Sequence, residues 1–192
     1  MDFTKLFLEG VANDQRYQEA LSFAHTHSTG NIWLIGGTVF RNIARAAYGI
    51  GHTAADFDFV FEKPMHLDES TVPSGWMLKR NSFGNPCLSK DDISIDYIPL
   101  HTIALFKQRN LPSTIDSLIN ATPLTIQSIA FDIDEQRVIG HKGINAITSK
   151  IVAVNDLPEL KNYCRLKGID PAEFLKRKAE SLYFYPDLSG LE

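Results

Sequence analysis

The sequence predicts an α/β domain of the α+β type, in which a mixed β-sheet is flanked by helices and further helices lie at both termini. The first observation is the order strand, double glycine, helix and strand over residues 32–61. The second is a group of three short segments over residues 76–99, separated by turn residues, which is typical of antiparallel strands in a meander. The third is the helical spacing of apolar residues near both ends of the chain.

The N-terminal segment, residues 3–27, has apolar residues at helical spacing that is interrupted near Asn13 and Asp14. This pattern predicts two helices packed on the sheet. His25 and His27 are two positions apart, which places them about 200° apart around a helix. We therefore do not expect them to bind one metal ion together.

The first predicted strand, residues 32–35, is an apolar run that stops at Gly36 and Gly37, as expected where a buried strand enters a tight turn. A helix is predicted from Thr38 onward because apolar residues then recur at helical spacing. Glycines between a strand and a helix let a ligand approach the backbone, and the N–H groups at a helix start bind anions. A phosphate site is therefore predicted at this turn.

The second predicted strand, residues 56–61, alternates polar and aromatic residues over most of its length. Side chains two positions apart lie on the same face of a strand, about 7 Å apart, so Asp56 and Asp58 point the same way and the phenylalanines point the other way. Two such carboxylates repel each other unless a cation lies between them. Mg²⁺ is a suitable cation because it binds through one or two carboxylates together with substrate phosphates.

A further aspartate, Asp96, lies in the last strand of the predicted meander. Ile95 and Tyr97 alternate with Ser94 and Asp96, so Asp96 is predicted on a polar strand face. Two interpretations remain open at this point. Asp96 either joins the aspartate pair as a third carboxylate or marks the solvated side of an edge strand.

The order strand, Gly-Gly, helix and Asp-x-Asp resembles the core of the nucleotidyltransferase superfamily that includes DNA polymerase β. It is most similar to the head domain of tRNA CCA-adding enzymes and bacterial poly(A) polymerases. Gly36, Gly37 and Val39 match the family pattern Gly-Gly-x-Val-Arg-Asp, whereas Phe40 and Arg41 replace its arginine and its aspartate.

A second stretch that resembles this head domain lies at residues 124–132. Thr125, Ile126, Ala130 and Asp132 coincide with the family pattern, and Gln127 replaces its asparagine. Residues 138–154 then follow the family's closing order of strand, glycine, short helix and strand. The resemblance thus extends over residues 32–154.

The resemblance implies a Mg²⁺-dependent nucleotidyltransferase that moves NMP from an NTP, by a two-metal mechanism, to a hydroxyl acceptor. That acceptor is an RNA 3′ end, a small molecule or a protein. Two Mg²⁺ ions, or Mn²⁺ in their place, are implied as cofactors. The implied catalytic residues and metal ligands are Asp56, Asp58 and Asp96, and the implied nucleotide-binding residues are Gly36, Gly37, Thr38 and Arg41.

The chain is expected to form a single domain over residues 1–192, with a core at about 30–155 and a C-terminal helical appendage at about 156–192. Short helices are predicted at 100–109 and at 113–120, where Ser113 is the expected N-cap. Pro171 is expected to open a last helix that extends through Tyr185. The basic run 176–178 on this helix is either a solvated face or an RNA contact.

The bulk composition limits the partners. There are 19 Lys and Arg residues against 23 Asp and Glu, a net charge of −4, which argues against strong autonomous binding of nucleic acid. The two cysteines, Cys87 and Cys164, are far apart in the sequence, as is usual in a reducing compartment, and no disulfide is expected. We find neither a signal peptide nor an apolar run long enough for a membrane span, so a cytoplasmic protein is expected.

Three alternatives remain. One is a catalytically degenerate nucleotide-binding or regulatory module of the same fold, which the departures at Phe40, Arg41 and Gln127 favour. Another is a Rossmann-type dinucleotide site, because Asp56 lies 20 positions after Gly36. That fingerprint requires glycines where this chain has Thr38 and Arg41. The third is purely structural, because Gly-Gly after a strand is common and alternating aspartates also occur on solvated strands.

Overall fold

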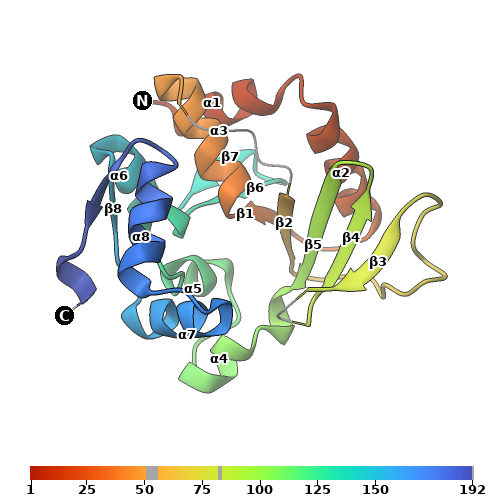
Figure 1. Ribbon diagram of the computed structural model, residues 1–192. Coiled ribbons are helices and arrows are strands. Elements are labelled where there is room, and N and C mark those ends of the chain that lie inside the picture. The colour runs from red at the N-terminus through yellow and green to blue at the C-terminus, as the bar shows by residue number, and fades with distance from the viewer. Residues whose placement is uncertain (51–55, 82–83, 192) are drawn as a thin grey trace.

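The protein is described here from a computed structural model that covers residues 1–50, 56–81 and 84–191. Seven strands form one mixed sheet in the order β3-β4-β5-β2-β1-β6-β7 (Figure 1). Their bounds are β1 Ile32–Ile35, β2 Asp56–Phe61, β3 Met77–Arg80, β4 Pro86–Lys90, β5 Ile93–Pro99, β6 Ala130–Asp132 and β7 Arg137–Ile139. Helices flank this sheet, which confirms the expected fold class.

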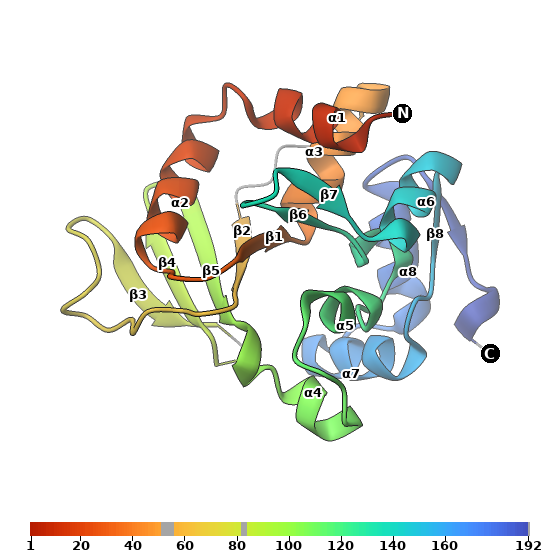
Figure 2. The ribbon, with the colours of Figure 1, turned by 180° about the vertical axis from the view of Figure 1, so that it is seen from behind.

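Three helices cover one face of the sheet (Figures 1 and 2). They are α1 Phe3–Val11, α2 Gln15–Thr26 and α3 Gly37–Tyr48. The first two confirm the expected break near Asn13, where the Asp14 side chain caps α2 by accepting hydrogen bonds from its first backbone N–H groups. Their aromatic side chains contact the sheet, with ring centroids 4.4 Å apart for Phe7 and Phe131 and 6.2 Å apart for Tyr17 and Phe57.

The strand β2 separates two environments, as its alternation predicts. Phe57, Phe59 and Phe61 have no exposed surface and face α1 to α3, whereas Asp56 is exposed and Asp58 is half-buried on the opposite face. A smaller apolar cluster covers part of that opposite face, formed by Trp33, Val60, Leu100, Phe106, Ile119 and Ala130. The aspartates lie beyond the end of this cluster.

The predicted meander is present. β3 pairs with β4 and β4 pairs with β5, both antiparallel. β5 then runs parallel to β2. Because β5 lies between β4 and β2, Asp96 is on an interior strand, so its interpretation as an edge-strand residue is wrong. Two parts of the expected elements, the end of the first meander strand at 82–83 and the turn at 51–55 before β2, lie outside the described residues.

The segment between β5 and β6 forms short helices. A 3₁₀ turn at Leu100–Thr102 precedes α4 Ala104–Arg109, so the single helix expected at 100–109 is divided at Ile103. Helix α5 spans Ile115–Asn120, and its N-cap is Thr114 rather than Ser113. The Thr114 hydroxyl accepts a hydrogen bond from the Ser117 backbone N–H at 3.2 Å, which satisfies a donor at the helix start. A second 3₁₀ turn, Thr125–Gln127, leads into β6.

The C-terminal part continues from β7 through α6 His141–Ser149, β8 Ile151–Ala153, α7 Leu157–Lys167 and α8 Pro171–Glu180. The expectation that the last helix extends through Tyr185 is wrong. It ends at Glu180, because Tyr183 has a left-handed backbone with φ 54° and β9 Tyr185–Asp187 then pairs with β8 in a separate parallel sheet. Tyr183 is 76% exposed, whereas Leu182 has no exposed surface.

Helices α7 and α8 pack into the main body of the protein. Leu160, Cys164 and Leu175 belong to the same buried cluster as the phenylalanines of β2. These helices therefore form part of the wall around the sheet. Among the described residues, none of the helices combines the length and the apolar character that a membrane crossing needs.

Candidate functional site

The parallel pairing of β2 and β5 brings the three predicted aspartates together. In this register Asp58 lies beside Asp96 and Asp56 lies beside Ser94, and neighbouring strands are about 4.8 Å apart. On the other side of β2, Ile35 of β1 lies beside Asp58. Positions 56, 58 and 96 share one face of the sheet, because residues two apart on a strand point the same way.

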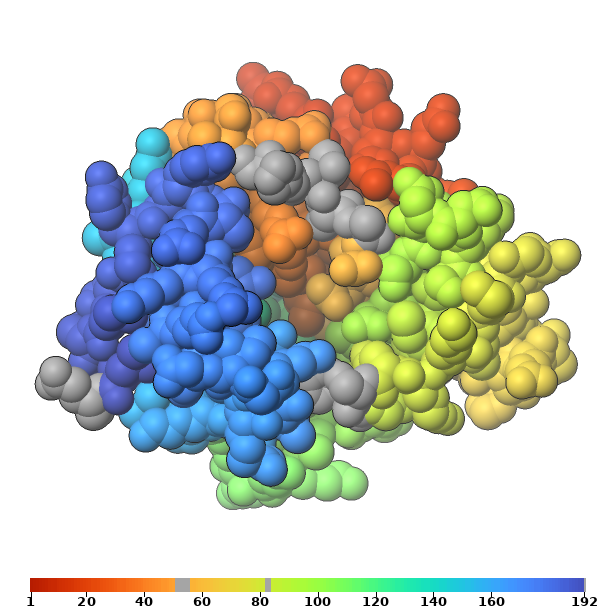
Figure 3. All heavy atoms as spheres, in the orientation of Figure 1, coloured from red at the N-terminus to blue at the C-terminus, as the bar shows by residue number. Residues whose placement is uncertain are grey.

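All three aspartates line one pocket of about 550 Å³. The space-filling view shows the molecule hollowed between the blue C-terminal helices and the yellow-green strands, with orange atoms at the floor of the hollow (Figure 3). Gly36, Gly37 and Arg41 also line this pocket, so six of the seven residues predicted from the sequence meet there. The remaining lining residues are Ile35, Phe40, Asn81, Ser94, Thr122, Gln127, Tyr163, Lys167 and Lys178.

Gly36 has a backbone conformation and a neighbour that both require glycine. Its φ is +74° and its ψ is −147°, a backbone conformation that residues other than glycine rarely adopt. A Cβ at this position would lie 2.5 Å from Oδ2 of Asp58. The Asp58 carboxylate therefore packs directly against the glycine turn at the start of α3.

Thr38, the seventh predicted residue, lies behind the pocket wall. It is 1% exposed, and its hydroxyl donates a hydrogen bond of 2.6 Å to the Asp56 backbone carbonyl. This bond ties the first turn of α3 to the beginning of β2. In the structure Thr38 thus positions Asp56.

The carboxyl of Asp58 has an abnormal acidity. Burial, followed by the negative charges of Asp96 and Asp56, raises its pKa to about 7, and the positive charge of Lys178 partly opposes this shift. The neighbouring Asp96 is held by Asn81, whose Nδ2 donates to Asp96 Oδ2 at 3.0 Å. The pocket therefore contains concentrated negative charge on the sheet face.

Three cationic side chains, Arg41, Lys167 and Lys178, line the pocket beside this negative charge. Arg41, on α3, lies with its guanidinium carbon 3.8 Å from the position of a Cβ on Gly37. Lys178, on α8, is half-buried, and its pKa is lowered by burial and by the nearby charge of Arg41, whereas Asp58 acts in the opposite direction. Within the described part of the chain, neither Arg41 nor Lys178 forms an ion pair within 4.0 Å.

The basic run at 176–178 does not form one face. Lys176 and Arg177 are exposed, and Arg177 pairs with Glu173 on the outside of α8. Lys178 alone enters the pocket, a role that the sequence analysis missed. A signal was available, because Lys178 lies four positions after the buried Phe174 and so shares its face of the helix. Tyr163 and Lys167 of α7, which also line the pocket, were missed without such a signal.

The pocket offers carboxylate oxygens as possible ligands for a metal ion. In the three described segments, no group of three His, Cys, Asp or Glu side chains is arranged to hold a metal ion. Mg²⁺ does not require such a cage, because it usually keeps water and substrate phosphates among its oxygen ligands. The adjacent carboxylates of Asp58 and Asp96, whose repulsion contributes to the raised pKa, fit a partial shell of this kind.

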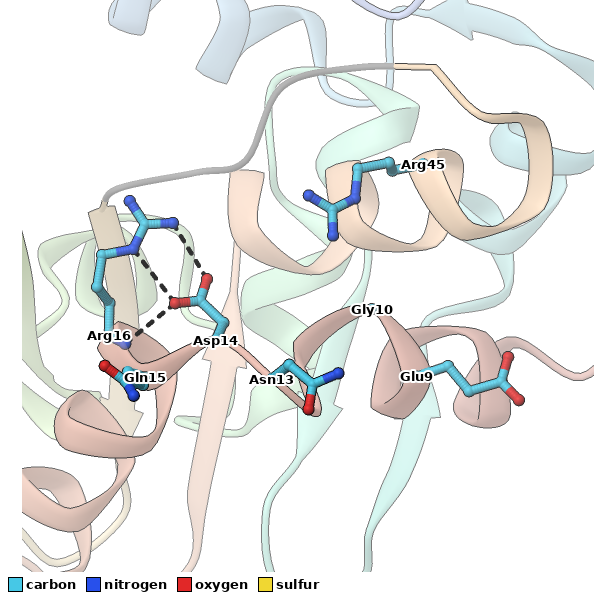
Figure 4. Close-up of a pocket in the computed structure, with 7 residues that line it drawn as sticks. All are labelled: Glu9, Gly10, Asn13, Asp14, Gln15, Arg16 and Arg45. Carbon is cyan, nitrogen blue, oxygen red and sulfur yellow. Dashed lines mark hydrogen bonds and ion pairs between the residues drawn. The ribbon is translucent and has the colours of Figure 1, made fainter.

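A second hollow, of about 470 Å³, lies where α1 meets α2 (Figure 4), and Asp56, Asp58 and Asp96 are not among its lining residues. Its charged groups largely serve the local structure. Arg16 binds the Asp14 carboxylate through Nε and Nη2, both at 3.2 Å, and also approaches Asp92 at 3.7 Å. We assign no chemistry to this hollow.

Comparison with known proteins gives structural matches only. The sequence matches no protein-family model and no curated protein. A CCA-adding enzyme in complex with CTP is similar, with a TM-score of 0.62 and 16% identity. The same kind of enzyme with ATP gives 0.59 and 17%, and Thermotoga maritima CCA-adding enzyme with tRNA gives 0.58 and 16%. These matches cover 97%, 97% and 99% of this chain.

The chain spans 43% of the length of each of these three solved structures. At this identity the likeness establishes the fold. The protein therefore has a nucleotidyltransferase-like fold similar to that of CCA-adding enzymes, as the resemblance of its sequence motifs implies.

Proposed function

We propose that this protein binds a nucleoside triphosphate in the pocket above β2 and β5 and transfers its nucleoside monophosphate to a hydroxyl acceptor. The observation that carries this proposal is the distribution of charge. Asp56, Asp58 and Asp96 occupy the sheet face, and the cations Arg41 and Lys178 lie across the pocket without an acidic partner within 4.0 Å in the described residues. The structural neighbours solved with CTP and ATP support the same ligand class.

The cationic side fits a triphosphate. Burial and, to a smaller extent, the nearby charge of Arg41 lower the pKa of Lys178, and an anion bound between these two cations would stabilise both charges. The turn at Gly36 and Gly37 adds backbone N–H groups at the start of α3, where the helix dipole favours negative charge. We therefore place the β- and γ-phosphates between this turn and the two cations.

The acidic side fits Mg²⁺ bound by the adjacent carboxylates of Asp58 and Asp96, with Asp56 on the same face of the sheet as a further candidate ligand. When bound, the metal supplies a Lewis acid that stabilises charge on the phosphate oxygens and lowers the pKa of a nearby hydroxyl. The protein side chains hold the carboxylates in place for this, since Thr38 fixes β2 and Asn81 fixes Asp96. Phosphate oxygens and water would complete the coordination.

In the proposed reaction the acceptor hydroxyl oxygen attacks the α-phosphorus, and the bond from that phosphorus to the pyrophosphate oxygen breaks. The proton of the hydroxyl passes to the Asp96 carboxylate. Negative charge grows on the leaving pyrophosphate, and Arg41 and Lys178 stabilise it. The products are the nucleotidylated acceptor and pyrophosphate, so no covalent intermediate on the protein is needed.

The binding step is tested by a thermal-shift titration with ATP, CTP, GTP and UTP, each with and without Mg²⁺. At least one nucleotide is expected to raise the melting temperature in a Mg²⁺-dependent way. Lys178→Gln should lose most of this shift, whereas the control Lys176→Gln, an exposed residue on the same helix, should keep it. An undiminished shift in Lys178→Gln would contradict the assignment of the triphosphate site.

The chemical step is tested with Asp58→Asn, which removes one carboxylate and keeps the side-chain shape. Transfer of label from an α-labelled NTP should fall by at least 10²-fold, in line with the loss of a charge-stabilising group. Wild-type transfer by this variant would refute the catalytic role of Asp58. Nucleotide binding by the wild-type protein without any transfer would instead favour a module of the same fold that has lost turnover.

A further inference from the structure

We propose that a further cavity, which lies beside the pocket and is distinct from the hollow at α1 and α2, binds the acceptor. This acceptor is a small molecule with an apolar body, a free hydroxyl group and a neutral or positive charge. The cavity has a volume of about 450 Å³. This inference rests on the function proposed above, because it names the substrate class that the same site would modify.

The cavity adjoins the carboxylates along the sheet face. Ile35 lines both hollows and is the strand partner of Asp58. Ile98, in the cavity wall, lies two positions after Asp96 on β5 and so points from the same face, about 7 Å further along the strand. A molecule bound against Ile98 would therefore reach the Asp96 carboxylate with a terminal hydroxyl.

Helix α7 separates the two hollows and contributes to both. Tyr163 and Lys167 line the first pocket, and Asn162 and Leu166 line the cavity. Asn81 and Asn85 continue this boundary on the other side, where the Asn85 backbone N–H donates to Asn81 Oδ1 at 3.1 Å. The two spaces therefore share a wall that is formed by Ile35 and by α7.

The lining of the cavity selects the chemical class. Its walls are mostly apolar, with Ile98 and Leu118 on one side and Leu166 on α7, and amide side chains such as Asn162 add hydrogen-bonding groups. Small-molecule sites typically combine such walls with a few polar groups in volumes of about 300–1,000 Å³. The size and the lining therefore fit a compact organic molecule.

The charge of the cavity disfavours a nucleic-acid strand. No lysine or arginine is among its lining residues in the described ranges, and the one ionisable lining residue is Glu159. Burial raises the pKa of this carboxyl, and Arg109 lowers it from 3.5 Å away. Arg109 also binds the Asp156 carboxylate at 2.5 Å, so the carboxylates of Asp156 and Glu159 share one guanidinium group. RNA binding needs cationic side chains that contact the phosphates, whereas the ionisable side chain in this cavity is the acidic Glu159.

The inference is tested by ligand-observed NMR and by nucleotidyl transfer with four probes at millimolar concentration. The probes are 2-phenylethanol, which is neutral, 2-amino-1-phenylethanol, which is cationic, 3-phenyllactate, which is anionic, and a short RNA oligonucleotide. Binding and labelling are expected for the neutral and cationic alcohols. The anion and the RNA should give less than a tenth of that labelling.

Leu166→Trp is the test variant, because Leu166 is 53% exposed and a larger side chain there fills the cavity without disturbing the core. Its alcohol binding and labelling should fall at least tenfold, whereas the Mg²⁺-dependent NTP shift should stay unchanged. Lys161→Trp, at an exposed position of α7 outside the cavity, is the matched control and should behave like the wild type. Glu159→Gln should reduce the preference for the cationic alcohol over the neutral one.

The outcomes separate the two proposals. If the NTP shift is present but alcohol binding is absent or unaffected by Leu166→Trp, the acceptor cavity is wrong and the nucleotide site stands. If Leu166→Trp abolishes the NTP shift, the cavity holds the nucleobase and the acceptor assignment is overturned. If the alcohols bind in a Leu166-dependent way but no NTP produces a shift, the cavity is a ligand site and the proposed nucleotidyl transfer fails.

Discussion

Replacement of Gly36 by alanine gives the sharpest test of the glycine turn. The conformation at φ +74° and ψ −147° costs a residue with a Cβ about 1–3 kcal/mol. The added Cβ would also meet Asp58 Oδ2 at 2.5 Å, so the carboxylate must move. We expect Gly36→Ala to lower the free energy of unfolding by more than the backbone cost alone and to remove the Mg²⁺-dependent NTP shift.

Gly49 provides a matched control for the cost of placing a residue with a Cβ at positive φ. It also has a positive φ, +69°, but a Cβ there has no neighbour within 4 Å. Gly49→Ala should therefore cost only about 1–2 kcal/mol and leave nucleotide binding intact. Urea unfolding at constant pH in EDTA measures both free energies.

A double-mutant cycle separates the clash from the strain. In an Asp58→Ala background the offending oxygen is absent, and the nearest remaining Asp58 atom to the new Cβ is the Asp58 Cβ at 3.9 Å. The cost of Gly36→Ala should then fall by about 0.5–3 kcal/mol, the usual range for residues in contact. An equal cost in both backgrounds would show that Gly36 and Asp58 do not constrain each other and would refute the reasoning.

Three further predictions concern stability. The pKa of Asp58 is raised to about 7 in the folded protein, against an ordinary value of 3.8. The stabilisation of the folded state by the protonated carboxyl is therefore present at low pH and is lost as pH rises through about 7. Because one pKa unit corresponds to about 1.4 kcal/mol, Asp58→Asn should gain up to about 4 kcal/mol over the wild type between pH 4 and pH 8 in EDTA, and a constant difference between the two proteins would contradict this. Tyr97→Phe should cost about 1–3 kcal/mol in urea unfolding, because the one hydroxyl proton is shared between the carbonyl oxygens of His27 and Met65, which lie 2.8 and 3.0 Å from the hydroxyl oxygen; an unchanged midpoint would show that this hydrogen bonding adds nothing. Asp156→Ala should cost about 1–2 kcal/mol through loss of the α7 N-cap, and since its pKa is lowered in the folded protein, the cost measured by urea unfolding should shrink as pH falls below about 4. A cost that stays the same at pH 3 and pH 7 would argue against the ionised cap.

The elements that the sequence predicted well are those with strong local patterns. The alternation in β2 determined which face each phenylalanine takes, because a one-residue shift would bury Asp56 and expose Phe57. The double glycine was also a reliable signal, since Gly36 has a backbone that other residues rarely adopt. The meander was recognisable because turn residues separate its strands.

Long-range features were harder to predict. The register that pairs Asp58 with Asp96 joins strands that a hairpin separates in the sequence, and no local pattern encodes it; the placement of Asp96 followed from the family resemblance. The end of α8 was missed because Leu182 continues the apolar spacing, although the chain has left the helix by then. Lys178 was missed because the three basic residues were treated as one exposed group, whereas helical geometry directs each of them differently.

The position of Lys178 on the last helix has a consequence for dynamics. The carboxylates belong to strands in the first half of the chain, and α8 comes near its end, so an anion held between them would link distant parts of the sequence. Local opening of α8 would then require release of the ligand, which adds the binding free energy to the cost of that opening. Amide hydrogen exchange in α8 should accordingly slow when nucleotide is bound, and amides that exchange only through global unfolding should slow as well, because the ligand stabilises the folded state.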